Sequence, residues 1–220
     1  MSAAPRNARH VHYDTKSAAY GSGSTRTGRI LELVGGPGRR VLDVACGPGH
    51  IGEQLRSRGN YVVGVEVSAA AAQEARTKLD EVHSFDVEDP WPAEVLEQSF
   101  DVVVLGEVLE HIFDPVEVLR VVHRVLAPNG RVVITTPNFL VWIARLQVLF
   151  GRFRYQRYGL FDFGHIRWFT YDYLRQVVSE AGFVIDTEWH VPHPKRLVRL
   201  TKAWPSLFAL NFVVSASKAR

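Results

Sequence analysis

The stretch Val41-Leu42-Asp43-Val44-Ala45-Cys46-Gly47-Pro48-Gly49 passes from an apolar run into a glycine-rich loop, and His50-Ile51-Gly52 follows it. Glycines at such a junction let the backbone turn sharply from a strand into a helix and approach a nucleotide-like ligand closely. The spacing of Gly47, Gly49 and Gly52 also satisfies the G-x-G-x-x-G pattern of dinucleotide sites. This pattern alone does not separate a nicotinamide site from a site for another nucleoside cofactor. It predicts the first strand of an α/β sheet, with a cofactor at the end of that strand.

The rest of the chain continues this rhythm, because apolar runs alternate with segments of helical period. Parallel strands joined by helices are typical of this pattern. We expect strands at residues 40–45, 61–65, 81–85, 101–105 and 131–135. We expect helices at residues 50–58, 69–79, 115–126 and 171–181. Two later strands, at residues 183–189 and 207–215, complete a predicted seven-stranded mixed sheet with helices on both faces, and residues 139–169 form a small cap after the fifth strand.

The bulk composition fits one α/β domain spanning residues 1–220, in which residues 1–28 form an N-terminal lid or flexible arm. A formal net charge of +3 is far below the excess of a dedicated phosphate-backbone binder, so nucleic acid is disfavoured as a partner. The lone cysteine, Cys46, excludes an internal disulfide and fits a reducing compartment. The N-terminus lacks the apolar core of a secretory signal, and no apolar stretch approaches the roughly 20 residues of a membrane span. We therefore expect a cytoplasmic protein.

Three acidic residues stand where the predicted strands meet a ligand. Asp43 lies inside the first strand, where a carboxylate suits a cationic ligand better than a pyrophosphate. Glu66 ends the second strand, where it can accept hydrogen bonds from a ribose diol, and Asp86 follows the third, within reach of an adenine amino group. Asp43 favours a cationic nucleoside cofactor over a nicotinamide dinucleotide, whereas Glu66 suits both. Glu88 and Asp89 are alternatives to Asp86.

With these residues, from about residue 40 to residue 183, the sequence resembles the class I S-adenosylmethionine-dependent methyltransferases. The resemblance implies a Rossmann-like fold, S-adenosylmethionine as methyl donor, and Glu66 and Asp86 as partners of its ribose and adenine. Ala45 departs from the family pattern, since many members have glycine there. The cofactor-binding residues expected on this basis are Asp43, Ala45, Gly47, Gly49, Glu66, Val67, Asp86, Val87, Gly106 and, from the N-terminal lid, Tyr20.

A second cluster of polar residues follows the fourth predicted strand. Glu107, Glu110 and His111 stand at positions i, i+3 and i+4, so one helical face would present two carboxylates and an imidazole. The E-x-x-E-H motif, with His165 farther on, resembles the metal site of small-RNA 2′-O-methyltransferases, and E-x-x-E-H is also similar to ubiquinone-biosynthesis O-methyltransferases. The resemblance implies a divalent ion bound by these four residues. Oxygen and nitrogen ligands suit Mg²⁺ or Mn²⁺.

The same residues are the candidates for catalysis. A bound cation lowers the pKa of an acceptor hydroxyl, so Glu107, His111 and His165 would act through the metal. If no metal is bound, His111 or His165 becomes the general base. Asp162 either orients His165 or belongs to a turn.

The acceptor is indicated only by a resemblance. Residues 151–167 resemble bacterial polysaccharide-tailoring methyltransferases, which favours a sugar or oligosaccharide hydroxyl. Aromatic residues in this segment can stack on sugars or pack a core of their own. The alternatives are a metal-free small-molecule methyltransferase, an RNA 2′-O-methyltransferase, a non-catalytic S-adenosylmethionine-binding protein and, last, a nicotinamide dehydrogenase. A homo-oligomer is compatible with all of them.

Overall fold

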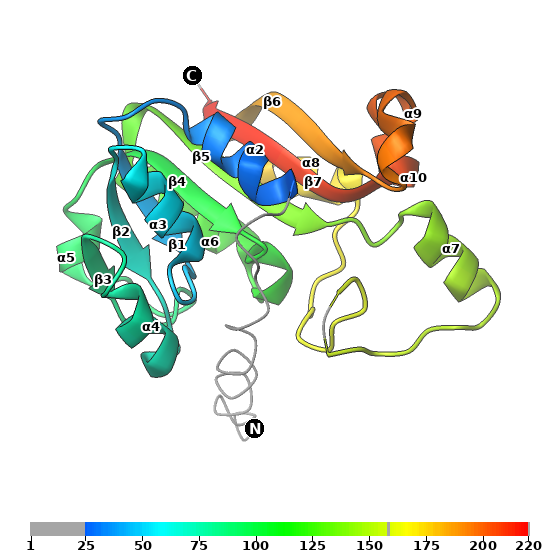
Figure 1. The fold of residues 1–220 in the computed structure, drawn as a ribbon, viewed down its shortest axis with the longest axis horizontal. Coiled ribbons are helices and arrows are strands. Elements are labelled where there is room, and N and C mark those ends of the chain that lie inside the picture. Colours follow the sequence, from blue (N-terminus) through cyan, green and yellow to red (C-terminus); the bar gives the residue numbers. More distant parts are fainter. Residues whose placement is uncertain (1–24, 158, 220) are drawn as a thin grey trace.

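A computed structural model describes residues 25–157 and 159–219 of the chain, and its centre is a seven-stranded sheet (Figure 1). The strand order is β3-β2-β1-β4-β5-β7-β6, with β7 antiparallel to both of its neighbours and the other pairs parallel. The strands are β1 (Arg40–Val44), β2 (Tyr61–Val65), β3 (Glu81–His83), β4 (Phe100–Gly106), β5 (Leu126–Pro137), β6 (Phe183–Pro192) and β7 (Ala209–Lys218). This is the Rossmann-like mixed sheet that the sequence predicts.

Helices cover both faces of the sheet (Figure 1). The helices are α2 (Thr25–Val34), α3 (His50–Ser57), α4 (Ala69–Ala75), α5 (Ala93–Leu96), α6 (Pro115–Val125), α7 (Trp142–Leu149), α8 (Tyr171–Glu180), α9 (Val198–Ala203) and α10 (Pro205–Phe208), with 3-10 turns η2 (Leu109–His111) and η3 (Lys195–Leu197). Because successive strand residues point to opposite faces, Val41 belongs to a buried cluster with residues of α2 and α3, and Leu42 belongs to another with residues of α6 and α8. The apolar runs of the central strands reflect this burial on both sides.

The N-terminal arm expected at residues 1–28 needs correction at its end. Helix α2 begins at Thr25, and its residues Ile30, Leu31 and Val34 are buried against the sheet. Residues 25–28 are therefore part of a packed helix. The remainder of the predicted arm, including Tyr20, lies outside the described residues.

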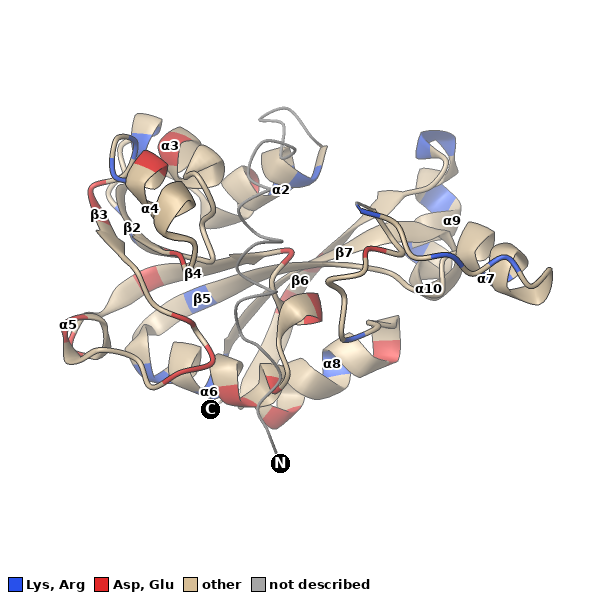
Figure 2. Cartoon of the chain, turned by 90° about the horizontal axis from the view of Figure 1, so that it is seen from below, with Lys and Arg blue, Asp and Glu red and all other residues tan. Residues whose placement is uncertain are grey.

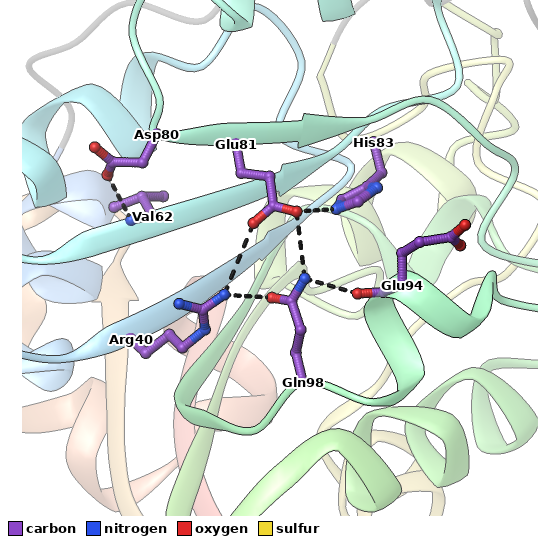
Figure 3. A network of polar contacts seen from close by, with 7 residues as sticks. All are labelled: Arg40, Val62, Asp80, Glu81, His83, Glu94 and Gln98. Carbon is purple, nitrogen blue, oxygen red and sulfur yellow. Dashed lines mark hydrogen bonds and ion pairs between the residues drawn. The ribbon is translucent and has the colours of Figure 1, made fainter.

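A polar network fastens the edge of the sheet where β1 and β3 begin (Figure 3). Arg40 donates to Gln98 at 2.6 Å and pairs with Glu81 at 3.7 Å. Glu81 also lies 2.7 Å from His83, and Gln98 donates to the backbone of Glu94 on α5 at 2.7 Å. The side chains are about one third exposed, so we assign this network a structural role at the edge opposite the carboxyl ends of the strands.

Residues 139–169 contain α7 and a long connection that returns to the sheet (Figure 1). Val141, Ala144 and Phe161 are buried together, with Phe139 and Trp168 packed against them. Phe139 and Trp168 have ring centroids 4.6 Å apart. Four aromatic side chains of this segment therefore belong to a small core of their own: Phe139, Trp142, Phe161 and Trp168.

Candidate active site

The glycine loop lies between β1 and α3 and contains three residues with left-handed backbone. The φ angles are 53° at Ala45, 55° at Gly47 and 81° at Gly49. Glycine adopts this conformation without strain, which explains why a glycine is the common residue at the position of Ala45. Gly52 packs closely, because a Cβ atom there would lie 2.4 Å from the end of the Leu79 side chain, which would have to shift. The loop therefore has the sharp turn and close packing that its sequence predicts.

Glu66 connects the glycine loop to the start of α4. Its two carboxylate oxygens accept hydrogen bonds from the backbone N–H groups of Gly47 and Ser68, each at 2.8 Å. The side chain is buried at the end of β2, beside the loop. The contact of Glu66 with a cofactor ribose stays a prediction.

Asp43 is buried below the same loop, with an exposed fraction of 2%. Burial raises its pKa to about 7, a hydrogen bond with the backbone of Gly52 opposes this rise, and the charge of Glu66 adds to it. Within the described part of the chain, Oδ2 of Asp43 has no hydrogen-bond partner. A cationic ligand nearby would favour the charged form of this carboxyl group.

The other predicted cofactor residues lie at the same edge. Asp86 follows β3 and accepts a hydrogen bond from the N–H of Glu88 at 3.0 Å, which makes it part of a turn. Val87 is buried, and its carbonyl accepts from the indole of Trp91 at 3.0 Å. Val67 follows Glu66, and Gly106 ends β4. The adenine contact of Asp86 stays a prediction.

Three of the four predicted metal ligands meet after β4. Glu110, His111 and His165 are buried, and ligand atoms from all three lie within 4.8 Å of one another. The two imidazole centroids are 4.9 Å apart. Residues 54 positions apart in the sequence thus form one donor group.

The chain segment that carries His165 is fixed by hydrogen bonds to the E-x-x-E-H segment. The N–H groups of Ile166 and Arg167 both donate to the carbonyl of Glu110 at 3.0 Å. Nδ1 of His111 lies 2.8 Å from the carbonyl oxygen of Gly164, and Nδ1 of His165 lies 3.1 Å from that of Leu160. A carbonyl can only accept, so each Nδ1 carries a proton, and in the neutral form of each ring the lone pair is on Nε2.

Glu110 is completely buried, with an exposed fraction of 0%. Burial raises its pKa well above the usual range and the charge of Glu107 adds to this, while Thr136 and Arg26 lower it less strongly. Among the described residues, neither carboxylate oxygen has a hydrogen-bond partner of good geometry. A carboxyl group in this environment is stabilised by binding a proton or a cation.

Glu107 is not part of this group, and the prediction of one helical face from Glu107 to His111 is wrong. The 3-10 turn spans only Leu109–His111, and Glu107 has a left-handed φ of 61° while its N–H bonds to the carbonyl of Thr135 at 3.0 Å. The β4–β5 pairing thus extends to Glu107 and displaces the start of the helical turn. Its carboxylate lies 3.2 Å from Arg26 and accepts from the amide of Asn211 and the hydroxyl of Thr135.

Arg26 was expected only as part of the N-terminal lid, and Thr135 and Asn211 were not predicted as site residues. They come from α2, β5 and β7, at long distances along the chain from Glu107. Thr135 stands at the end of an apolar strand, which is a weak signal for such a role. We find no sequence signal that identifies Asn211.

Asp162 belongs to the turn that precedes His165. Its carboxylate accepts from the N–H of Gly164 at 2.7 Å, and its carbonyl accepts from the N–H of His165 at 3.0 Å. The side chain is buried. Asp162 therefore positions His165 through the backbone, which agrees with the turn alternative.

The fold and the cofactor edge define a class I S-adenosylmethionine-dependent methyltransferase. The chain belongs to the methyltransferase-domain family, whose model matches residues 23–188. Family membership makes S-adenosylmethionine the methyl donor.

Curated relatives resemble about half of the chain. The ubiquinone biosynthesis O-methyltransferase of Pseudomonas aeruginosa (strain LESB58) is 35% identical over 117 residues, which are 51% of this chain and 50% of that protein. The protein of the same name from Hahella chejuensis (strain KCTC 2396) is 39% identical over 113 residues, 50% of this chain and 48% of that protein. The chain spans about half the length of the curated relatives that it matches.

Solved structures resemble the chain over more of its length. A TehB-like S-adenosylmethionine-dependent methyltransferase from Corynebacterium glutamicum superposes with a TM-score of 0.63 at 18% identity, covering 97% of this chain and 100% of that chain. The [4+2]-cyclase SpnF superposes with a TM-score of 0.62 at 19% identity, covering 88% of this chain and 79% of that chain. At these identities the likeness shows the fold, and the cyclase illustrates that this fold hosts more than one reaction.

Proposed function

We propose that this chain transfers the methyl group of S-adenosylmethionine to a hydroxyl oxygen of a sugar or oligosaccharide, with Mg²⁺ or Mn²⁺ bound at Glu110, His111 and His165. The observation that carries the proposal is the buried group of one carboxylate and two imidazoles within 4.8 Å. It follows β4, at the sheet edge where the glycine loop follows β1. Ligands of open α/β sheets bind at this edge.

Two features support a metal at this group. The buried carboxylate of Glu110 has no hydrogen-bond partner of good geometry among the described residues, so a cation would offset a costly burial. Both imidazoles hold Nδ1 against a backbone carbonyl, as metal-ligating histidines commonly do. Two nitrogen ligands favour Mn²⁺ over Mg²⁺, and the same donor set also fits Fe²⁺.

Different residues would bind the cofactor and activate the acceptor hydroxyl in methyl transfer. The glycine loop and Glu66 would bind the nucleoside part of the cofactor, and Asp43 offers a negative charge to its cationic part. A hydroxyl held beside a divalent cation loses its proton more readily and becomes a better nucleophile. The transfer then depends mainly on the alignment of the two bound substrates. Without a metal, His111 or His165 would accept the hydroxyl proton.

The sugar acceptor is supported by the pattern of residues 151–167. Phe161 is buried in the cap, whereas Tyr155 is exposed and lies in sequence next to Arg154. An exposed ring beside a guanidinium group can contact a sugar face and its hydroxyls. A hydroxyl of a small molecule in ubiquinone biosynthesis is the second candidate, which the names of the curated relatives favour.

A tritiated-methyl transfer assay tests both candidates. The acceptors are a panel of oligosaccharides and a panel of small hydroxylated aromatic compounds, each with chelator, without it, and after addition of Mg²⁺, Mn²⁺ or Fe²⁺. We expect label in an oligosaccharide, loss of transfer in chelator and recovery with a divalent ion. Full transfer in chelator would exclude the metal, and label only in the aromatic panel would exclude the sugar.

Glu110→Gln is the matched test within the site, because it keeps the shape of the side chain and removes its charge. Glu117→Gln is the control, since Glu117 is an exposed acid on α6. We expect the first variant to lose metal-dependent transfer and the second to keep it. Equal activity in both variants would exclude Glu110 as a ligand.

A further inference from the structure

Two segments of the chain contain basic residues but no acidic ones. Residues 118–161 and residues 189–220 contain no Asp or Glu. We call residues 145–157 and 195–204, which lie within these segments, the end surface. Eight basic residues of the end surface are exposed. They are Arg145, Arg152, Arg154, Arg157, Lys195, Arg196, Arg199 and Lys202. The whole chain has 26 basic and 23 acidic residues, so the rest of it has 18 against 23.

The end surface also contains most of the exposed large hydrophobic side chains of the described residues. Leu149 and Phe150, at the end of α7, are 76% and 71% exposed. Of the fifteen large hydrophobic side chains that are exposed among the described residues, nine belong to the end surface. They are Leu146, Val148, Leu149, Phe150, Phe153, Tyr155, Val198, Leu200 and Trp204. Clustered exposure of this kind marks a contact site more often than scattered exposure does.

The two segments lie together at one end of the molecule. Figures 1 and 2 both place α7, α9 and α10 at the end far from β3 and α4, and Figure 2 shows basic residues along them. The indole of Trp142 donates to the carbonyl of His193 at 3.0 Å, and Arg145 donates to that of Ser206 at 3.3 Å. These contacts join α7 to the region of α9 and α10. The end surface is therefore a continuous part of the fold.

We propose that the end surface binds the headgroup region of an anionic phospholipid membrane. Basic side chains there would pair with lipid phosphates while Leu149, Phe150 and neighbouring apolar side chains enter the boundary of the acyl chains. No helix among the described residues has the length and apolar character to cross a membrane, so the contact is one of docking on the surface. This inference does not depend on the acceptor of the proposed function.

The combination of charge and apolar exposure favours a membrane over the alternatives. A nucleic-acid groove needs basic groups, but it does not need fully exposed aliphatic side chains such as Leu149. A second copy of the chain would have to bring eight like charges together without acids to pair them. An anionic bilayer accepts both kinds of side chain at once.

Flotation of the full chain with lipid vesicles tests the proposal. Vesicles of phosphatidylcholine alone are compared with vesicles that also contain phosphatidylglycerol. We expect binding to the second kind only, and a fall in binding as the salt concentration rises. Absence of binding to anionic vesicles, or tight salt-sensitive binding of polyuridylate instead, would overturn the proposal.

Two double variants separate the charge from the apolar contribution. Arg152→Gln with Arg154→Gln should lower binding to anionic vesicles about tenfold or more. Leu149→Ser with Phe150→Ser should lower it by a similar factor at unchanged charge. The control is Arg58→Gln with Arg124→Gln, which removes two exposed charges outside the end surface and should leave binding within about twofold.

S-adenosylhomocysteine binding by calorimetry shows whether each variant is folded. All three variants should retain it, because the glycine loop lies at the other end of the molecule (Figure 1). Retention of vesicle binding by the Leu149 and Phe150 variant would overturn the proposed insertion. Equal losses in the control and the Arg152 and Arg154 variant would overturn the assignment of the site to this surface.

Discussion

Asn211 donates from its side-chain amide to both carboxylate oxygens of Glu107, at 3.3 and 3.2 Å. Glu107 has a left-handed backbone at the end of β4, and Asn211 comes from β7, which runs antiparallel beside β5. The last described strand of the chain therefore fixes a carboxylate at the edge where the glycine loop and the histidines lie. Arg26 on α2 pairs with the same carboxylate at 3.2 Å.

Substitution of Asn211 by Asp should reduce methyl transfer. The new carboxylate would face Glu107, so repulsion would displace the Glu107 side chain from its present position. We expect kcat to fall about tenfold or more, while the affinity for S-adenosylhomocysteine changes little. Ser217→Ala, at the other end of β7, is the control. Unchanged kcat in Asn211→Asp would show that the position of Glu107 is irrelevant to transfer.

Glu110→Gln should stabilise the metal-free protein. Ionisation of Glu110 costs more in the folded chain than in the unfolded chain, and its carboxylate has no hydrogen-bond partner of good geometry among the described residues. A neutral amide should therefore raise the free energy of unfolding at pH 8 by about 1–3 kcal/mol. In the wild-type chain Mn²⁺ should raise the melting temperature, and in the variant it should not. Thermal melts with and without Mn²⁺ measure both effects. A variant that is less stable than wild type without metal would contradict the account of Glu110.

Asp43 should make stability depend on pH. Its pKa is about 7 in the folded chain, above the ordinary 3.8, so the native state holds the proton more tightly than the unfolded state. The free energy of unfolding should therefore fall as the pH rises from about 4 to about 7 and level off above that. Asp43→Asn should remove up to about 4 kcal/mol of this fall. Parallel stability curves for variant and wild type, from denaturant titrations at each pH, would contradict the prediction.

Glu66→Ala should weaken cofactor binding. The variant removes the acceptor of the N–H groups of Gly47 and Ser68, so the glycine loop loses a support in addition to the expected ribose contact. We expect at least a roughly tenfold loss of affinity for S-adenosylhomocysteine by calorimetry. Glu117→Ala, an exposed acid on α6, is the control and should bind normally. Normal binding by both variants would remove Glu66 from the cofactor site.

The sequence was most informative where a structural feature depends on neighbouring residues. The apolar runs and the glycines of residues 47–52 determine the strand, the turn and the close packing locally, so the order of the elements could be predicted. The helical spacing of Glu107, Glu110 and His111 gave a wrong prediction at Glu107. The hydrogen bond of the Glu107 N–H to Thr135 extends the pairing with β5, so the helical turn begins after Glu107. Whether a strand ends at a given residue depends on its partner strand, which the local pattern does not contain.

The partners of Glu107 could not be predicted for a related reason. Arg26 and Asn211 reach it from α2 and β7 through the tertiary fold. The sequence places Arg26 in the expected N-terminal lid but does not pair it with Glu107, and nothing in the sequence around Asn211 distinguishes it from other polar residues. His165 was identified by its resemblance to a known motif. Its meeting with Glu110 and His111 depends on the backbone bonds from Ile166 and Arg167 to Glu110.

The distribution of charge has a consequence that the net value of +3 conceals. With the basic residues of the end surface at one extremity and the excess of acids elsewhere, the described part of the molecule would have an electric dipole moment along its length. The electric field of a negatively charged surface would exert a torque on such a dipole, so the molecule would turn before any contact forms. Orientation would then be selected during diffusion, and it would weaken once the Debye length becomes short compared with the molecule.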